Sequence, residues 1–170
     1  MKGIILLFAA AFWLNQDPGF YDITIQKADG SYVQMSAFSG KKIMIVPYNP
    51  GNSDYSQLQL LNSLQKSQNR SLIIIAVPAI DLSDSAGIAL SNKQSDSSYS
   101  FLITKPMMVR KSAGNNQGLL FQWLTKVKGN THFDRDVDQE GETFYINEKG
   151  MLYGVMDRQT TNADILSVLN

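Results

Sequence analysis

The single histidine of the chain, His132, precedes two carboxylates, Asp134 and Asp136, in a polar stretch. A histidine near a serine and a carboxylate is the arrangement with which enzymes activate a nucleophile. Ser53 is the serine that such a triad would use, but the surrounding Gly51-Asn52-Ser53-Asp54 is not the turn that presents a nucleophilic serine. We therefore expect His132 to be a solvated loop residue rather than a catalytic base.

Acidic side chains recur at alternate positions in the same stretch. Asp136, Asp138 and Glu140 fall at the first, third and fifth positions of a calcium-binding loop, and Gly141 falls at the sixth, where the chain must turn. The twelfth position is Asn147, which lacks the bidentate carboxylate of such loops. The pattern predicts at most a weak Ca²⁺ site at these three residues, and the alternative is a solvated acidic loop beside an arginine.

The chain of 170 residues contains no cysteine, which excludes thiol redox chemistry, disulfide bonds and a lipid anchor on cysteine. Its fifteen basic and fifteen acidic residues balance, and no long run of one charge sign interrupts them. Without a net positive field there is little to attract nucleic acid or an anionic membrane. We expect no cofactor, and a small molecule or a protein as the partner.

The N-terminal residues have the anatomy of a secretory signal. Lys2 precedes an apolar stretch from Ile4 to Leu14, which is shorter than the roughly 20 residues of a membrane-spanning helix. Ala9-Ala10-Ala11 offers small residues for cleavage, although a cut there would leave three bulky apolar residues on the mature end. We predict a signal peptide over residues 1–16 and one domain over 17–170, periplasmic or extracellular; the alternative is a buried first strand.

Hydrophobic patterns set the order of elements in the first half. Alternating apolar residues on either side of a turn at 28–31 predict a β-hairpin, and the run from Lys42 to Val46 is typical of a strand buried in mid-sheet. A loop is expected from Pro47 to Gly51. Leucines at helical spacing then predict a helix, followed by a second buried strand from Leu72 to Val77. Strand, helix and strand in this order indicate a right-handed crossover between parallel strands.

The second half continues this alternation. Its expected elements are a short exposed helix and loop over 81–98, extended pieces at 101–103 and 107–109, an amphipathic helix from 119 to 127, a loop over 131–142, a hairpin of 144–146 and 152–156, and a last helix over 161–169. The order predicts an α/β chain with a thioredoxin-like fold, in which helices flank a central mixed sheet and an extra β-hairpin stands at the N-terminus.

Short motifs in a particular order point to a family. They are Phe20-Tyr21-Asp22, Asp29-Gly30, Phe38-Ser39-Gly40-Lys41, Val77-Pro78, the stretch from Val109 to Leu124 with Gly114 and Asn116, and Phe144-Tyr145-Ile146-Asn147-Glu148-Lys149-Gly150. On these residues the chain resembles glutathione peroxidases from about Phe20 to its end. The resemblance implies the thioredoxin-like fold and a catalytic pocket where the central strands end.

The residues that the resemblance places in that pocket depart from the family pattern. The peroxidatic cysteine or selenocysteine, activated at a helix N-terminus, would fall at Asn52. The family's glutamine would fall at Asp81 or its neighbour, and its tryptophan and asparagine at Gln139 and Glu140. A misalignment by one or two residues would not restore the chemistry, because no register creates a cysteine. We therefore do not expect peroxide reduction.

A polar rim would surround this altered pocket and suit binding without turnover. Its expected members are Asn49, Gly51, Asn52, Tyr55, Asp81 and His132. We expect an exported, non-catalytic binding or interaction module. The alternatives are an enzyme of another class that uses His132 and nearby carboxylates as acid–base groups, and a residual peroxidase-type role in oxidative stress.

Overall fold

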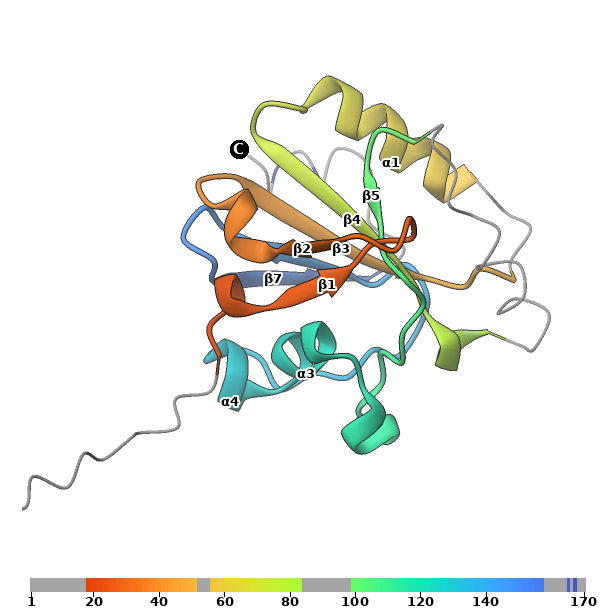
Figure 1. Ribbon diagram of the computed structural model, residues 1–170, viewed down its shortest axis with the longest axis vertical. Helices are drawn as coiled ribbons and strands as arrows, with labels where there is room; N and C mark the ends of the chain where they lie inside the picture. Colours follow the sequence, from red (N-terminus) through yellow and green to blue (C-terminus); the bar gives the residue numbers. More distant parts are fainter. Residues whose placement is uncertain (1–17, 52–55, 84–98, 158–164, 166, 168–170) are drawn as a thin grey trace, which may run out of the picture.

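A mixed five-stranded sheet forms the centre of the computed structural model, which describes residues 18–51, 56–83, 99–157, 165 and 167 (Figure 1). The strand order is β5-β4-β3-β6-β7. Neighbours β3, β4 and β5 run parallel, whereas β6 is antiparallel to both β3 and β7. The bounds are β3 Lys42–Tyr48, β4 Leu72–Pro78, β5 Leu102–Ile103, β6 Thr143–Ile146 and β7 Leu152–Met156. The predicted mixed sheet is confirmed.

Strands β3 and β4 are covered on both faces, which explains why their sequences are almost continuously apolar. Ile43 and Ile45 of β3 belong to one buried cluster, while Met44 and Val46 belong to another on the opposite face. Strand β4 alternates in the same way, in register with β3. Two cores therefore share one sheet.

Helix α1 (Ser56–Ser67) covers one face of the sheet and connects the parallel strands β3 and β4. Leu58 and Leu61 are buried in the cluster of this face. The buried amide of Gln65 fixes the helix to β4: its Nε2 donates to the Leu72 carbonyl at 2.8 Å, and its Oε1 accepts from the Ile74 N–H at 2.7 Å. The helix predicted from leucine spacing is confirmed.

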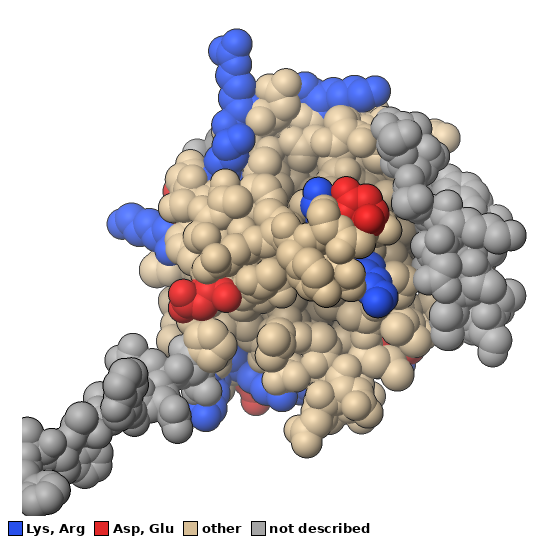
Figure 2. Space-filling model, viewed as in Figure 1, with Lys and Arg blue, Asp and Glu red and all other residues tan. Residues whose placement is uncertain are grey.

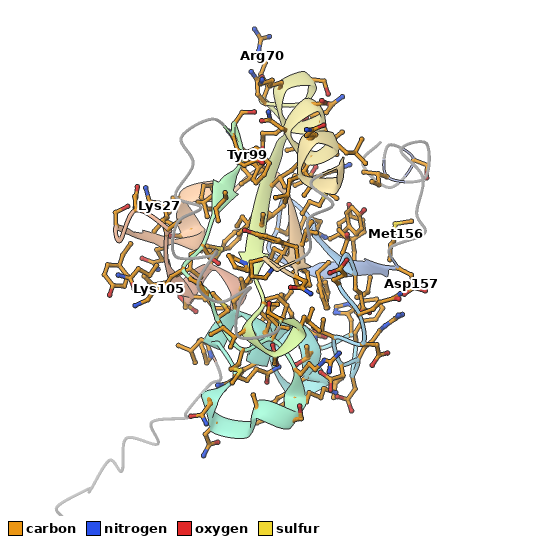
Figure 3. All side chains as sticks on the ribbon, turned by 90° about the vertical axis from the view of Figure 1, so that its right-hand side faces the viewer. Lys27, Arg70, Tyr99, Lys105, Met156 and Asp157 are labelled. Atoms are coloured by element: carbon orange, nitrogen blue, oxygen red, sulfur yellow. The ribbon has the colours of Figure 1, made fainter. Side chains whose placement is uncertain are left out.

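The opposite face carries the N-terminal hairpin and the later helices (Figure 1). Strands β1 (Thr24–Gln26) and β2 (Tyr32–Gln34) pair antiparallel as a separate two-stranded sheet. The hairpin joins the outer edge of β5, where the Ala28 N–H donates to the Ile103 carbonyl at 2.9 Å and the Lys105 N–H to the Gln26 carbonyl at 2.8 Å. Figure 3 shows Lys27 and Lys105 on this side of the molecule, away from Met156 and Asp157. The predicted extra hairpin is present.

Short 3₁₀ turns fill several connections. They are η1 (Phe20–Asp22), η2 (Met35–Phe38), η3 (Ile80–Leu82) and η4 (Lys111–Asn116). The segment 107–109, which we expected to be extended, forms isolated β-bridges rather than a strand. Met107 pairs with Ala79, and Met108 pairs with Gln117. Of these turns, η3 and η4 contribute side chains or backbone groups to the candidate site.

Two boundaries differ from the sequence prediction. The predicted helix from 119 to 127 is divided into α3 (Leu119–Thr125) and α4 (Val127–Asn130) by the extended backbone of Lys126. The buried Asn130 amide accounts for the break, because its Nδ2 donates to the carbonyls of Trp123 at 3.1 Å and Leu124 at 2.9 Å. Strand β3 also continues through Pro47 and Tyr48, which we predicted to begin a loop. Pro47 is tolerated there because it lies beyond the last residue pair between β3 and β6, so its missing N–H removes no hydrogen bond to β6.

Three predicted segments fall wholly or largely outside the described residues. They are the signal peptide over 1–16, the helix and loop over 81–98 beyond Ser83, and the last helix over 161–169, of which Ile165 and Ser167 are described in helical conformation. Ile165 is buried in the cluster beneath α1. The apolar pattern of that helix therefore placed at least one residue in the core.

Candidate functional site

The candidate site lies where β3 and β4 end at the same edge of the sheet, the usual position of a ligand crevice in an α/β fold. Asn49 follows β3, and its Oδ1 accepts the Gly51 N–H at 2.8 Å, which closes a tight turn. Asn52, Ser53 and Tyr55 lie outside the described residues. What the site contains is therefore built from η3, the segment before η4, and the loop before β6.

Asp81 in η3 follows β4 at the position that the resemblance gives to a glutamine. Its carboxylate accepts the Val109 N–H at 2.9 and 3.1 Å from its two oxygens, and the Arg110 N–H at 2.7 Å. Such charge-assisted bonds to backbone N–H groups are stronger than neutral ones. Asp81 holds the chain before η4 against η3, and both its oxygens are engaged by backbone.

Arg110 continues this connection into the loop before β6. Its guanidinium donates to the carbonyls of Val137 at 3.2 Å and Asp138 at 3.0 Å. The loop in turn reaches the end of β3, where the Gly141 N–H donates to the Pro47 carbonyl at 2.9 Å. Hydrogen bonds thus tie the segments that bear Asp81, Gln139 and Glu140 to one end of the sheet, with Gln139 exposed and Glu140 half-buried.

The predicted calcium site is not assembled. Asp136 directs Oδ1 at the backbone N–H groups of Lys111 and Val137, each at 2.8 Å. Asp138 is exposed, and its own N–H donates to Glu142. Within the described ranges no group of three or more acidic, histidine or cysteine side chains is placed to hold a metal ion. At the three predicted positions, Asp136, Asp138 and Glu140, backbone donors orient the first carboxylate, and the described residues give the cation prediction no support.

An ion pair between a buried glutamate and a partly exposed arginine, which the sequence analysis missed, lies beside this loop. The side chain of Glu142 has no exposed surface, and its Oε1 lies 2.6 Å from Nε of Arg135. Arg135 also contacts Asp157 after β7, with Nη2 and Oδ1 2.5 Å apart. Burial raises the pKa of Glu142, against the opposing effects of the Asp138 N–H and the Arg135 charge. The available signal was an acidic residue directly before an apolar strand.

His132 lies at the end of α4, and its hydrogen bonds are local. Its ring Nδ1 is 2.9 Å from the Asn130 carbonyl oxygen and 3.0 Å from Oγ1 of Thr131, and its side chain is exposed. In the described part of the chain no hydrogen bond or ion pair joins this ring to a carboxylate. The structure therefore provides no oriented acid–base pair at His132.

Among the described residues at this end of the sheet, Asp81, Arg110 and Asp136 hold neighbouring segments together. The second charge pair, Lys111 with Asp134 at 2.5 Å, also links η4 to the loop before β6. Chemically, the arrangement can hold three segments together and present backbone and loop surface. It supplies no thiol, because the chain has none.

The sequence matches no protein-family model and no curated protein. Solved structures do resemble it. The crystal structure of Trgpx in its apo form is 17% identical, with a TM-score of 0.66, over 89% of this chain and 93% of that chain. The crystal structure of T. cruzi GPX1 is 16% identical, with a TM-score of 0.64, over 89% and 94%. The pneumococcal exposed lipoprotein thioredoxin Etrx1 from Streptococcus pneumoniae is 14% identical, with a TM-score of 0.57, over 87% and 97%.

These similarities show the fold: the chain has the thioredoxin-like fold in a form similar to glutathione-peroxidase-like structures. The predicted fold class is confirmed, and nearly the whole length of each of these structures is matched. Among the described residues, no helix combines the length and the apolar character that crossing a bilayer requires.

Proposed function

We propose that this chain is an exported, non-catalytic domain with a glutathione-peroxidase-like fold, and that it works as a binding or interaction module. The observation that carries the proposal is the engagement of Asp81, whose carboxylate is bound by two backbone N–H groups at a position where the resemblance implies a catalytic glutamine. A side chain that holds a loop is not available to stabilise a reacting peroxide. The lack of any cysteine supports the same conclusion.

The test is a coupled peroxidase assay on the full chain, with hydrogen peroxide as oxidant and glutathione or thioredoxin as reductant. We expect no turnover above buffer. The matched variant is Asn52→Cys, which restores a thiol and nothing else; we expect it to react with peroxide no faster than free cysteine, because Asp81, Gln139 and Glu140 are not the family's donors. Protein-dependent turnover by the unmodified chain would contradict the proposal.

Export rests on the sequence of residues 1–16, with one lysine followed by a short apolar stretch. The measurement is the intact mass of the protein recovered from periplasmic and extracellular fractions of cells that express the full chain. Loss of a mass corresponding to an N-terminal segment ending near residue 16 supports export. An unprocessed chain confined to the cytoplasm contradicts it.

A role as a binding module predicts that a ligand raises the melting temperature without being converted, since a ligand that prefers the folded state stabilises it by mass action. The alternative of an enzyme that uses His132 predicts a reaction that His132→Ala abolishes in a folded protein. No contact of His132 with a described residue favours that alternative, because the hydrogen bonds of its ring within the described ranges go to Asn130 and Thr131.

A further inference from the structure

A groove separate from the sheet end lies between the N-terminal segment 18–24 and the helices α3 and α4. Its volume is about 470 Å³, within the size range of small-molecule sites. Its lining includes Ile23, Leu119, Trp123, Lys126, Lys128 and Gly129. It shares no residue with the braced end of the sheet.

Trp123 is the central polar feature of the groove. Its side chain is only 7% exposed, and its buried indole Nε1 has no hydrogen-bond partner among the described residues. Phe20 packs against the ring at a centroid distance of 5.1 Å, on the hairpin side. Gly129, which also lines the groove, comes so close to the ring that a Cβ there would lie 3.2 Å from Cδ1, the atom next to Nε1. A buried donor without an acceptor is unfavourable, and a ligand oxygen would satisfy it.

The rim of the groove combines exposed apolar surface with positive charge. Leu119 is 64% exposed, although it begins a helix whose other apolar side chains are buried. Lys126 follows Trp123 by three residues, across the break between α3 and α4, and Lys128 lines the same groove. The acidic residue of the lining, Asp22, already accepts the Gly19 N–H through Oδ2 at 3.0 Å.

The surrounding surface has the same character. Over the face that carries the hairpin, charged side chains are sparse, and basic side chains lie along its lower edge at the level of α4, with an acidic side chain among them (Figure 2). This face therefore presents few charges to a ligand, and an anionic group finds positive charge at its edge. Neither feature requires the residues of the braced sheet end.

We propose that this groove is a binding site for small amphipathic carboxylates. The apolar body of the ligand covers Leu119 and Ile23, while its carboxylate accepts the Trp123 indole N–H and has Lys126 as counter-ion. A carboxylate fits better than a neutral alcohol because it supplies both the acceptor and the negative charge. This assignment is independent of whether the sheet end has any catalytic activity.

The test uses the full chain with Trp13→Phe, which leaves Trp123 as the single tryptophan, and decanoate as the probe. We expect a saturable change in tryptophan fluorescence with decanoate below its micelle concentration. Decanol and decyltrimethylammonium have the same apolar body without the negative charge, and we expect each to bind at least about tenfold more weakly. Equal binding of the three probes, or no saturable change with decanoate, would overturn the proposal.

Matched variants locate the site. Lys126→Gln should weaken decanoate binding roughly tenfold, the loss expected for one charge-assisted interaction. The control is Lys66→Gln, which removes one positive charge from an exposed position of α1, on the face of the sheet opposite the groove. This variant should leave the decanoate affinity unchanged. Trp123→Phe keeps a ring but removes the donor, and its decanoate-induced rise in melting temperature should be smaller than in the parent. If Lys66→Gln weakens binding as much as Lys126→Gln, the attraction is nonspecific and the assignment fails.

Discussion

The end of the sheet beyond β3 and β4 and the groove beside α3 differ in how their polar groups are engaged. At the sheet end, Asp81, Arg110 and Asp136 all bond to backbone of a neighbouring segment. In the groove, the Trp123 N–H has no partner in the part of the chain that the structure describes, and Leu119 is exposed. The sheet end is the usual position of a ligand crevice in this kind of fold, yet its described polar side chains hold segments of the protein together. The groove instead has a donor and an apolar side chain that a ligand can contact.

The largest expected effect is that of Asp81→Ala on stability. Loss of the carboxylate leaves the N–H groups of Val109 and Arg110 without an acceptor, so we expect the free energy of unfolding to fall by about 3 kcal/mol. Urea denaturation measures it, with Asp134→Asn as the control, because that exposed residue makes a surface ion pair. If Asp81→Ala leaves the free energy of unfolding unchanged, the Asp81 carboxylate does not stabilise the end of the sheet, and the contrast with the groove is lost.

The next largest effect is expected for Glu142→Ala, which should lower the free energy of unfolding by about 2 kcal/mol. This loss is smaller than is usual for breaking a buried ion pair, because Arg135 is partly exposed. The pH dependence sharpens this. Burial raises the folded-state pKa of Glu142 above its ordinary 4.5. Below that ordinary value both states are protonated, and as the pH rises through the raised pKa the unfolded chain ionises more readily, so stability is lost.

Glu142→Gln lacks this ionisation, so the stability advantage of the unmodified chain over the variant should shrink as the pH rises from about 4 to 8. Chemical denaturation at a series of pH values measures the difference. A difference in the free energy of unfolding that stays constant across that range would mean that the pKa of Glu142 is the same in the folded and unfolded states. The contribution of the ion pair would then not depend on pH.

Leu119→Ser tests the groove side of the contrast. Because Leu119 is exposed, its replacement should change the free energy of unfolding by less than about 0.5 kcal/mol. Decanoate affinity should nevertheless fall several-fold, as the apolar cover for the ligand is lost. A variant that loses stability but keeps its affinity would show that the side chain packs within the protein and does not contact the ligand.

The smallest effect is expected at the hairpin turn, in neither region. Hydrogen bonds from Ser31, its side chain first, lower the pKa of Asp29 to about 2. This contribution to stability is present above the ordinary value of 3.8 and is lost as the pH falls through about 2. Asp29→Asn should therefore melt slightly below the unmodified chain at neutral pH and together with it in strong acid. Ser31→Ala should reproduce the effect, and a gap that persists in acid would exclude the carboxylate as its cause.

Much of the fold was predictable because the apolar periods of β3, β4 and α1 are strong and local. The break at Lys126 was not, because it depends on the Asn130 side chain reaching the carbonyls of α3. The carboxylates at alternate positions suggested a cation, but the backbone N–H of Lys111 in η4, distant in the sequence, orients Asp136 together with the N–H of the adjacent Val137. The groove was missed for the same reason. Its lining comes from segment 18–24 and from the helices α3 and α4, and the residue spacing within one segment does not predict a contact between two segments.

The attachment of the N-terminal hairpin to β5 has a consequence for self-association. Ala28 and Lys105 bond across the outer side of β5, so an incoming chain finds no free row of backbone donors there, and lysines stand at that border. Stacking of sheets edge to edge into a fibre needs two open edges on every molecule. A strand of another molecule that pairs directly with β5 would therefore first have to displace this hairpin.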